Sequence, residues 1–139
     1  MTYRAQQSIP ILVVAFGGRI FGVDPASGRH IWGHESREPS QLHIVRLHVV
    51  GDRVYAVIDR ELRVLSYTTG QVLSSVSIPH GATSTMMLLE GRIYCAGNGA
   101  VACFGLDGAL LWADEFSGMG YGDVAFAVPG YAVQADRDS

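Results

Sequence analysis

Short apolar runs alternate with glycine-rich or polar turns along most of the chain. Three such runs, 11–16, 53–58 and 92–97, consist largely of Val, Ile, Leu, Ala, Tyr and Phe. They end at Gly-Gly, Asp-Arg and Asn-Gly, and a second apolar run follows each of these turns. Two strand-like runs joined by a short turn predict a β-hairpin. Because no stretch has the 3.6-residue period of an amphipathic helix, we expect an all-β chain.

Each hairpin belongs to a longer unit of about forty residues that occurs three times. The hairpin is followed by a turn with a glycine, a third strand and, after a polar connection, a last strand. The expected third strands are 29–35, 71–77 and 109–116, and the expected last strands are 42–49, 84–89 and 123–128. A period of this length is typical of four-stranded propeller blades. We therefore predict one domain, 1–139, of three four-stranded antiparallel blades with limits of about 9–48, 49–89 and 90–128.

Many of the expected strands are apolar at both alternate sets of positions, as in Ile11-Leu-Val-Val-Ala-Phe16. An antiparallel sheet with one face in water would instead alternate between apolar and polar residues. These sheets are therefore expected to be covered on both faces, as they are when blade stacks on blade. A single sandwich of about twelve strands fits the same pattern but leaves the repeat unexplained.

The turn of the first unit has a specific sequence. Residues 22–32 read Gly-Val-Asp-Pro-Ala-Ser-Gly-Arg-His-Ile-Trp. Asp24 is placed to accept hydrogen bonds from turn amides, Gly28 to take a left-handed conformation, and Trp32 to offer a large apolar surface with one N–H donor. The segment resembles the tryptophan-docking motif Ala-x-Asp-x-x-Thr-Gly-x-x-x-Trp of the pyrroloquinoline-quinone-like (PQQ-like) β-propeller repeats.

The other two units carry partial copies of this motif. The second keeps Gly70 but has Ser74 in place of the tryptophan, whereas the third keeps Gly108 and Trp112. The resemblance implies that the tryptophan docks against a neighbouring blade and ties the blades into a ring. Quinone-dependent dehydrogenases with similar repeats use larger propellers and a calcium ion. The acidic residues of this chain lack the spacing of a calcium loop, so we expect no cofactor.

Three blades are too few to close a ring, since propellers have about 4 to 8. Two copies related by a two-fold axis would supply six, and such homodimers are the commonest soluble oligomers. The C-terminal segment 123–134 resembles the first two strands of another blade. We expect its first strand to complete the first blade of the partner chain and to cover an exposed edge. The residues expected at this ring-closure interface are Val124, Ala125, Phe126, Ala127 and Val128.

Composition narrows the choice of partners. The chain is 48% hydrophobic, which suffices for a packed core, and its net charge is -3 at pH 7. Its basic residues are scattered singly, which argues against nucleic acid as a partner. The apolar run from Ile9 to Phe16 is too short to span a bilayer and lacks the flanks of a signal peptide. We expect no membrane association and a cytoplasmic location.

The two cysteines, Cys95 and Cys103, lie on either side of a Gly-Asn-Gly turn. A two-residue loop at Asn98-Gly99 would place Cys95 opposite Ala102, with the thiols on opposite faces, whereas a loop one residue longer would place the cysteines opposite each other. In a reducing compartment, buried free thiols are favoured over a disulfide.

Candidate catalytic groups are few. Of the five histidines, His30 and His34 are expected to share a strand face, but a metal ion would need further ligands; the others are His43, His48 and His80. Glycine-rich residues 118–122 have no following helix, which favours a flexible connection over a ligand loop. The polar loop 35–41 is either a partner contact or simply solvated. Tyr55 and Tyr94 occupy the same position in their repeats, which favours packing between blades over a carbohydrate-stacking site.

We therefore expect a non-catalytic propeller, assembled as a homodimer, that binds a protein or a small ligand. The competing hypothesis is a cofactor-binding or enzymatic propeller similar to quinone oxidoreductases. Its site would lie in the central channel, where residues 84–88 and 124–128 of both chains converge. A third possibility is that the chain forms part of a larger propeller with a different chain.

Overall fold

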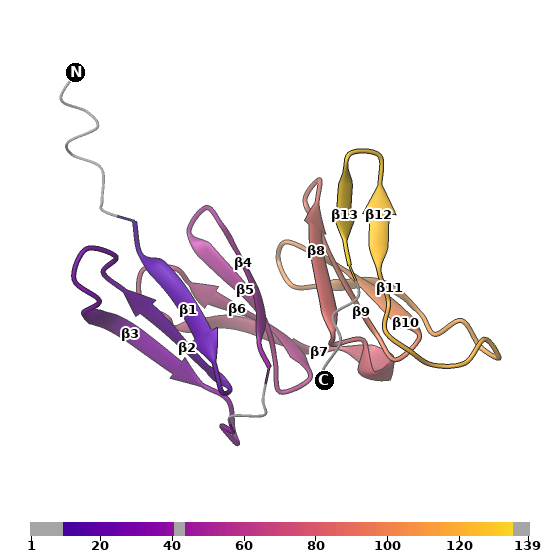
Figure 1. Cartoon of the computed structure of the whole chain (residues 1–139), viewed down its shortest axis with the longest axis horizontal. Helices are drawn as coiled ribbons and strands as arrows, with labels where there is room; N and C mark the ends of the chain where they lie inside the picture. The colour runs from indigo at the N-terminus through magenta and orange to yellow at the C-terminus, as the bar shows by residue number, and fades with distance from the viewer. Residues whose placement is uncertain (1–9, 41–43, 135–139) are drawn as a thin grey trace.

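The computed structural model describes residues 10–40 and 44–134 and contains thirteen strands in four antiparallel sheets. These sheets follow one another along the chain (Figure 1). The first has three strands, β1 (Leu12–Phe16), β2 (Arg19–Val23) and β3 (His30–Glu35). The second has β4 (Arg46–Val50), β5 (Arg53–Ile58), β6 (Glu61–Ser66) and β7 (Val72–Ser77). The third has β8 (Thr85–Leu89), β9 (Arg92–Gly97), β10 (Ala100–Gly105) and β11 (Leu110–Asp114), and β12 (Phe126–Val128) pairs with β13 (Tyr131–Val133) in a final hairpin.

The all-β prediction is confirmed, but the sheets are out of phase with the expected repeat limits. The strand that we placed last in the first unit, 42–49, corresponds to β4 and pairs with β5 of the next unit. In the same way β8 pairs with β9 of the third unit. Within the described residues, two of the three expected four-stranded sheets are therefore complete. The first sheet has three strands, β1, β2 and β3, which correspond to β5, β6 and β7 of the second sheet.

The three long hairpins turn over two residues, and both turn residues have positive φ. The pairs are Gly17–Gly18, Asp59–Arg60 and Asn98–Gly99. This is the type I′ geometry that matches the twist of the flanking strands. The turn at Asn98–Gly99 places Cys95 opposite Ala102, as the shorter of the two expected loops requires. Both thiols are free and buried, which confirms the expected state of the cysteines.

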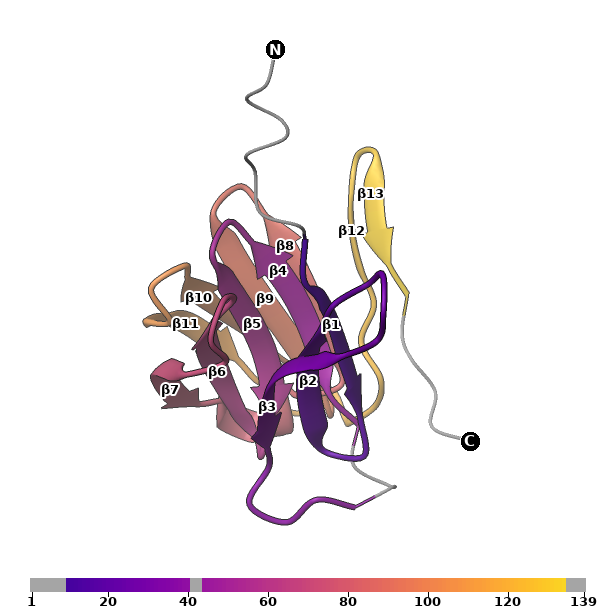
Figure 2. The same ribbon diagram turned by 90° about the vertical axis from the view of Figure 1, so that its left-hand side faces the viewer.

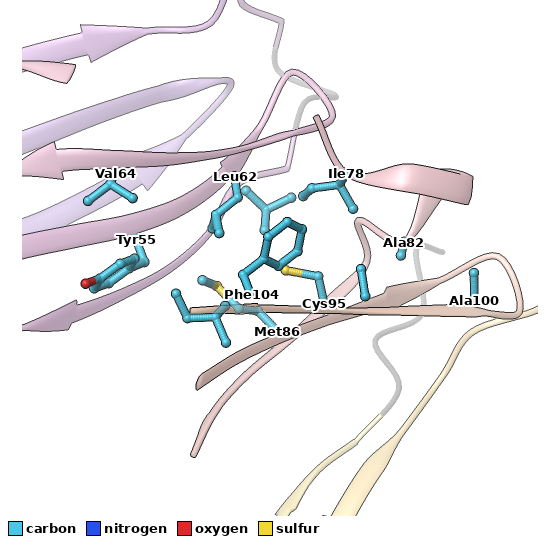
Figure 3. Close-up of a cluster of buried hydrophobic side chains, with 12 residues drawn as sticks. Tyr55, Leu62, Val64, Ile78, Ala82, Met86, Cys95, Ala100 and Phe104 are labelled. Atoms are coloured by element: carbon cyan, nitrogen blue, oxygen red, sulfur yellow. The ribbon is translucent and has the colours of Figure 1, made fainter. Parts of the chain in front are cut away.

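The first three sheets stack face to face (Figure 2). The core lies between them. Ile20 and Trp32 of the first sheet pack with Val54 and Leu65 of the second. A larger cluster joins the second sheet to the third, and its side chains point toward one another in Figure 3. The second sheet is thus covered on both faces, which explains why β5 is apolar at successive positions from Val54 to Ile58.

A short 3-10 turn, η2 (Pro79–Gly81), connects the second and third sheets. Within the residues that the structure describes, no helix is long and apolar enough to cross a membrane.

Candidate functional site

Trp32 on β3 lies against the glycine turn of the next sheet. The residue is 8% exposed, and its indole Nε1 donates a hydrogen bond to the carbonyl of Tyr67 at 2.8 Å. A Cβ atom at Gly70 would overlap this ring, as would a Cβ atom at Gly22 on the other side. Two glycines on different sheets therefore form the slot that holds Trp32. The glycine at 70 is needed both for this close approach and for its φ of 75°.

The first sheet carries the same turn in an ordered form. The carboxylate of Asp24 accepts hydrogen bonds from the amide of Ala26 at 2.9 Å and from the hydroxyl of Ser27 at 3.1 Å. The amide of Gly28 donates to the carbonyl of Asp24 at 2.7 Å, and Gly28 has φ of 75°. These are the roles that the sequence motif assigns to Asp24 and Gly28. Unlike Gly70, however, Gly28 is exposed.

At the junction between the second and third sheets, a smaller side chain lies against the turn glycine. Ser74 stands where Trp32 stands in the first sheet, and its Oγ would lie 2.9 Å from a Cβ atom at Gly108. The hydroxyl of Tyr55 donates to the carbonyl of Leu106 at 2.8 Å, the bond that the indole makes at the first junction. In the first and second sheets, one of the two places therefore holds a large side chain and the other a smaller one.

This arrangement confirms that Tyr55 packs between sheets. At the first junction Val13 accompanies Trp32, whereas at the second Tyr55 accompanies Ser74. In the third sheet both places are large, since Tyr94 and Trp112 lie across from each other through Cys103. The rings of Tyr94 and Trp112 have centroids 6.3 Å apart. The repeats can be aligned by sequence, but only the hydrogen bonds show that Tyr55 at the second junction takes the part that Trp32 has at the first.

The two ends of the stack expose apolar side chains. Trp112 is 44% exposed, against 8% for Trp32. At the other end, Leu12 and Phe16 on β1 are 53% and 61% exposed. Phe16 packs against Phe21, which faces the same side of the first sheet. Each end thus has the composition of a sheet face that is normally covered.

The C-terminal hairpin lies beside the third sheet. The carbonyl of Val124 accepts a hydrogen bond from the buried hydroxyl of Thr85 at 2.9 Å, and the ring of Phe126 packs edge-on against Tyr94. Of the residues expected at ring closure, Phe126, Ala127 and Val128 form β12, whereas Val124 and Ala125 precede it. The hairpin has the order of the first two strands of another sheet, as β8–β9 does. This end of the chain therefore carries two strands of a further sheet.

An ion network occupies the face where the β5–β6 turn meets the connection after β3. Arg63 is 5% exposed and binds Asp59 and Glu61, and its Nη1 lies 3.1 Å from His34 Nε2. Arg37 from the loop binds Asp59 and Glu61 as well. The sequence did not reveal this network because its members lie in three different segments.

Two pKa shifts follow from the network. A hydrogen bond from Ser75, supported by those from Arg63 and Arg37, lowers the pKa of Glu61 to about 2. Burial and the adjacent Arg63 lower the pKa of His34, so its imidazole is neutral at pH 7. A neutral Nε2 accepts the hydrogen bond that Arg63 donates. The polar loop 35–41 is thus anchored to the second sheet through Arg37, at least over the described part of it.

The expected shared face of His30 and His34 is not found. His30 packs against Phe21 with ring centroids 5.1 Å apart, whereas His34 points toward Arg63 of the second sheet. The cause is a register shift in the β2–β3 pairing between Gly22 and Val23, which the spacing of the histidines does not reveal. His43 lies outside the described residues.

The remaining candidates lie apart from one another. His48 is on β4 and partly buried, and His80 is in η2, where its Nδ1 is 3.1 Å from Glu115. Within residues 10–40 and 44–134, no three His, Cys, Asp or Glu side chains form a group that would hold a metal ion. Burial raises the pKa of Cys95 to about 12, with a smaller effect of Cys103, and burial also raises the pKa of Cys103. Both are therefore thiols at neutral pH and weak nucleophiles.

The connection from β11 to β12 forms an open pocket of about 450 Å³ with the β9–β10 turn and η2. One point of this connection is fixed, because the amide of Gly99 donates to the carbonyl of Gly122 at 2.8 Å. A Cβ atom at Gly99 would lie 2.6 Å from the carbonyl oxygen of Gly120, so the turn requires glycine there. The glycine-rich run is therefore seated on the neighbouring turn. The residues that line the pocket are His80, Asn98, Glu115, Phe116, Ser117, Gly118, Gly120 and Tyr121.

Known proteins share this architecture. Residues 11–130 match the family described as outer membrane protein assembly factor BamB. No curated protein sequence matches the chain. Among solved structures, BamB from Moraxella catarrhalis has a TM-score of 0.64 and 17% identity, over 91% of this chain and 44% of that chain. Quinohemoprotein alcohol dehydrogenase from Comamonas testosteroni has a TM-score of 0.62 and 15% identity, over 76% of this chain and 19% of that chain.

The chain spans less than half the length of either of these structures. At such low identity the similarity is one of fold, and it agrees with the stacked antiparallel sheets and with the Trp32 junction. The family match covers all four sheets except the last strand. The resemblance inferred from the Asp24–Trp32 motif is thereby confirmed. The chain belongs to the PQQ-repeat β-propeller family described as outer membrane protein assembly factor BamB.

Proposed function

We propose that the protein is a non-catalytic propeller module that binds a protein or a small ligand through its loops and assembles as a homodimer. The observation that carries this proposal is the group of exposed apolar side chains between β11 and β12. Met119 is 83% exposed, Tyr121 is 86% exposed and Phe116 is 48% exposed. Apolar and aromatic side chains that gather beside a polar rim are typical of interaction sites. Here the rim is the His80–Glu115 pair.

The backbone of this connection supports the same role. Gly118 and Gly120 have φ of 81° and 94°, which side-chain-bearing residues rarely adopt. These glycines hold Met119 and Tyr121 out from the surface, while the bond between Gly99 and Gly122 seats the segment. A partner would meet the two exposed side chains of Met119 and Tyr121 on a connection that is fixed at Gly122.

Arg63, Thr85 and the two cysteines are buried groups with settled structural roles, which supports a binding role over catalysis. Arg63 is engaged by two carboxylates, and the hydroxyl of Thr85 donates to a backbone carbonyl. The two thiols are protonated at neutral pH because burial raises the pKa of both. A nucleophile or a general base needs a free and activated group, and these side chains are committed elsewhere.

The test of the binding role begins with affinity capture on the full chain and identification of the retained protein. That protein is then titrated against the Met119→Ser, Tyr121→Ser double variant, for which we expect a loss of affinity of about tenfold or more. Leu73→Ser is the matched control, because Leu73 is 52% exposed on β7, away from these loops. Equal affinity of the double variant and the control would contradict a role for the β11–β12 connection.

The competing hypothesis of a cofactor-binding or enzymatic propeller stays a prediction. Its test is the absorbance spectrum and the metal content of the purified protein. Detection of bound quinone or calcium would refute the proposal of a non-catalytic module. The expected cytoplasmic location also stays a prediction, and cell fractionation tests it.

The homodimer is supported by the first sheet, which has three strands within residues 10–40 where the next two sheets have four, and by the extra hairpin β12–β13. Sedimentation at micromolar concentrations is expected to give twice the chain mass of 15.0 kDa. A single species at the chain mass would refute this part of the proposal while leaving the binding role intact.

A further inference from the structure

One contact recurs between successive sheets of this chain. A side chain on the outermost strand of each sheet lies on the turn glycine of the sheet that follows. Trp32 of the first sheet lies on Gly70 of the second, and Ser74 of the second lies on Gly108 of the third. The series leaves one member without its counterpart at each end of the chain, namely Trp112 of the third sheet and Gly28 of the first.

Trp112 has the same position in its sheet as the docked Trp32, but no following sheet covers its ring among the described residues. It lies on β11 opposite Cys103, as Trp32 lies on β3 opposite Gly22. Its exposed fraction is 44% rather than 8%. The ring of Tyr94 supports it from the sheet side at 6.3 Å. An aromatic side chain that is held in place and left exposed to water is a strong anchor for an interface, because its burial removes a large apolar surface from water.

Gly28 has the position of a receiving glycine without the ring. The turn that carries it is built like the turn of Gly70, since the amide of each glycine donates to the carbonyl four residues earlier, at 2.7 Å for Gly28 and 2.8 Å for Gly70. Both glycines have φ of 75°. Among the described residues, no heavy atom beyond the adjacent chain lies within 4 Å of a Cβ position at Gly28, whereas the Trp32 ring fills that space at Gly70.

The apolar surroundings agree with these two positions. Leu12 and Phe16 line the open face of the first sheet, and Phe126 extends the aromatic face of Tyr94 and Trp112 at the other end. The two faces are therefore alike in kind to the faces that pack inside the chain, where Val13 and Ile20 meet the second sheet.

We propose that Trp112 of one copy docks on the Asp24–Gly28 turn of a second copy, and that the second copy returns the same contact. Pro25 stands where Tyr67 stands in the second sheet, so its carbonyl is the acceptor for the indole N–H of Trp112. Because one chain carries both halves of the contact, two copies make two identical junctions about a two-fold axis. This inference rests on the proposed homodimer and names the contact that forms it.

The protein contains two tryptophans, so the fluorescence of Trp112 is isolated by subtracting the spectrum of Trp112→Ser from that of the wild type. Serine is the residue that the second sheet carries at this place, which makes the variant a mild one. As the wild-type concentration is raised, we expect the Trp112 emission to move to the blue and its quenching by iodide to fall. Sedimentation of Trp112→Ser should show association weakened by about tenfold or more.

A second variant tests the receiving turn. In Gly28→Asn the backbone conformation is retained, because Asn tolerates positive φ, but the added side chain blocks the place of the ring. It is expected to weaken association as much as Trp112→Ser, whereas Leu73→Ser is expected to leave it unchanged.

The outcomes separate the two proposals. A dimer of unchanged strength in Trp112→Ser, or a Trp112 that iodide still quenches in the dimer, would overturn the docking contact and leave the homodimer standing. A wild-type chain that is monomeric at every concentration would overturn both. A wild-type chain that associates only with a different repeat-containing protein would show that Trp112 serves another partner, and it would also overturn the contact between copies.

Discussion

At the scale of single residues, the same glycine conformation has two different environments. Gly28 and Gly70 have the same φ, but only Gly70 lies under the Trp32 ring. Gly28 is therefore a matched control for the free-energy cost of adding a side chain at Gly70.

Gly70→Ala is expected to lower the free energy of unfolding by about 3 kcal/mol, because it adds overlap with the Trp32 ring to the backbone strain of positive φ. Gly28→Ala should cost only the strain, about 1–2 kcal/mol. Denaturant unfolding at low protein concentration, where intermolecular contacts do not contribute, measures both. Equal losses in the two variants would mean that the Trp32 slot adds nothing to stability.

Glu61 predicts how stability depends on pH. Its pKa in the folded state is about 2, below the ordinary value of 4.5, since Ser75, Arg63 and Arg37 stabilise the carboxylate. A lowered pKa stabilises the folded state above the ordinary pKa, and this stabilisation is lost as the pH falls from about 4.5 to about 2. Glu61→Gln lacks this titration. We therefore expect the stability difference between the wild type and Glu61→Gln to shrink over that range in denaturant titrations, and a constant difference would contradict it.

Some of these residues were predictable from the sequence and others were not. Asp24, Gly28 and Trp32 form a linear motif, so the turn roles of Asp24 and Gly28 follow from residue type, and the docking of Trp32 follows from the resemblance to the PQQ-like repeats. Arg37, Asp59, Glu61 and Arg63 have no such signal, because sheet stacking and a hairpin turn bring them together. The register shift that separates His30 from His34 likewise depends on backbone hydrogen bonds and not on residue type.

At the scale of the elements, the hairpins were predictable and the membership of the sheets was not. Each apolar run with its two-residue turn identifies a pair of strands. The strand after each polar connection is apolar in every unit, so its composition does not reveal whether it joins the sheet before it or the one after it. The structure places β4 and β8 with the hairpins that follow them, since a two-residue turn connects β4 to β5 and another connects β8 to β9.

The C-terminal hairpin yields a prediction at this scale. In the proposed dimer, β12 pairs with β1 of the partner, and β13 is not needed. Deletion of residues 130–139 should therefore preserve the dimer or strengthen it, whereas deletion of 123–139 should abolish it and expose strand edges that aggregate. Sedimentation and light scattering of the two truncated chains measure this. Loss of the dimer in the shorter deletion would show that β13 is part of the interface.

At the scale of the whole molecule, stability and association are expected to be linked. If the folded chain binds a second copy and the unfolded chain does not, the melting temperature rises with protein concentration. Calorimetry from low to high micromolar concentration should show this rise for the wild type and a smaller one for Trp112→Ser. A melting temperature independent of concentration in the wild type would contradict folding linked to assembly.

The pairing of β12 with β13 has a consequence for the rate of assembly. In the complete sheets the second strand, β5 or β9, binds the edge of the first strand, and in the hairpin β13 already holds that edge of β12 through three residue pairs. The partner's β1 can take this edge only after β13 leaves it. The hairpin would then open before each association event. At high protein concentration, the rate of dimer formation would therefore stop rising with concentration, because hairpin opening within one chain would limit it.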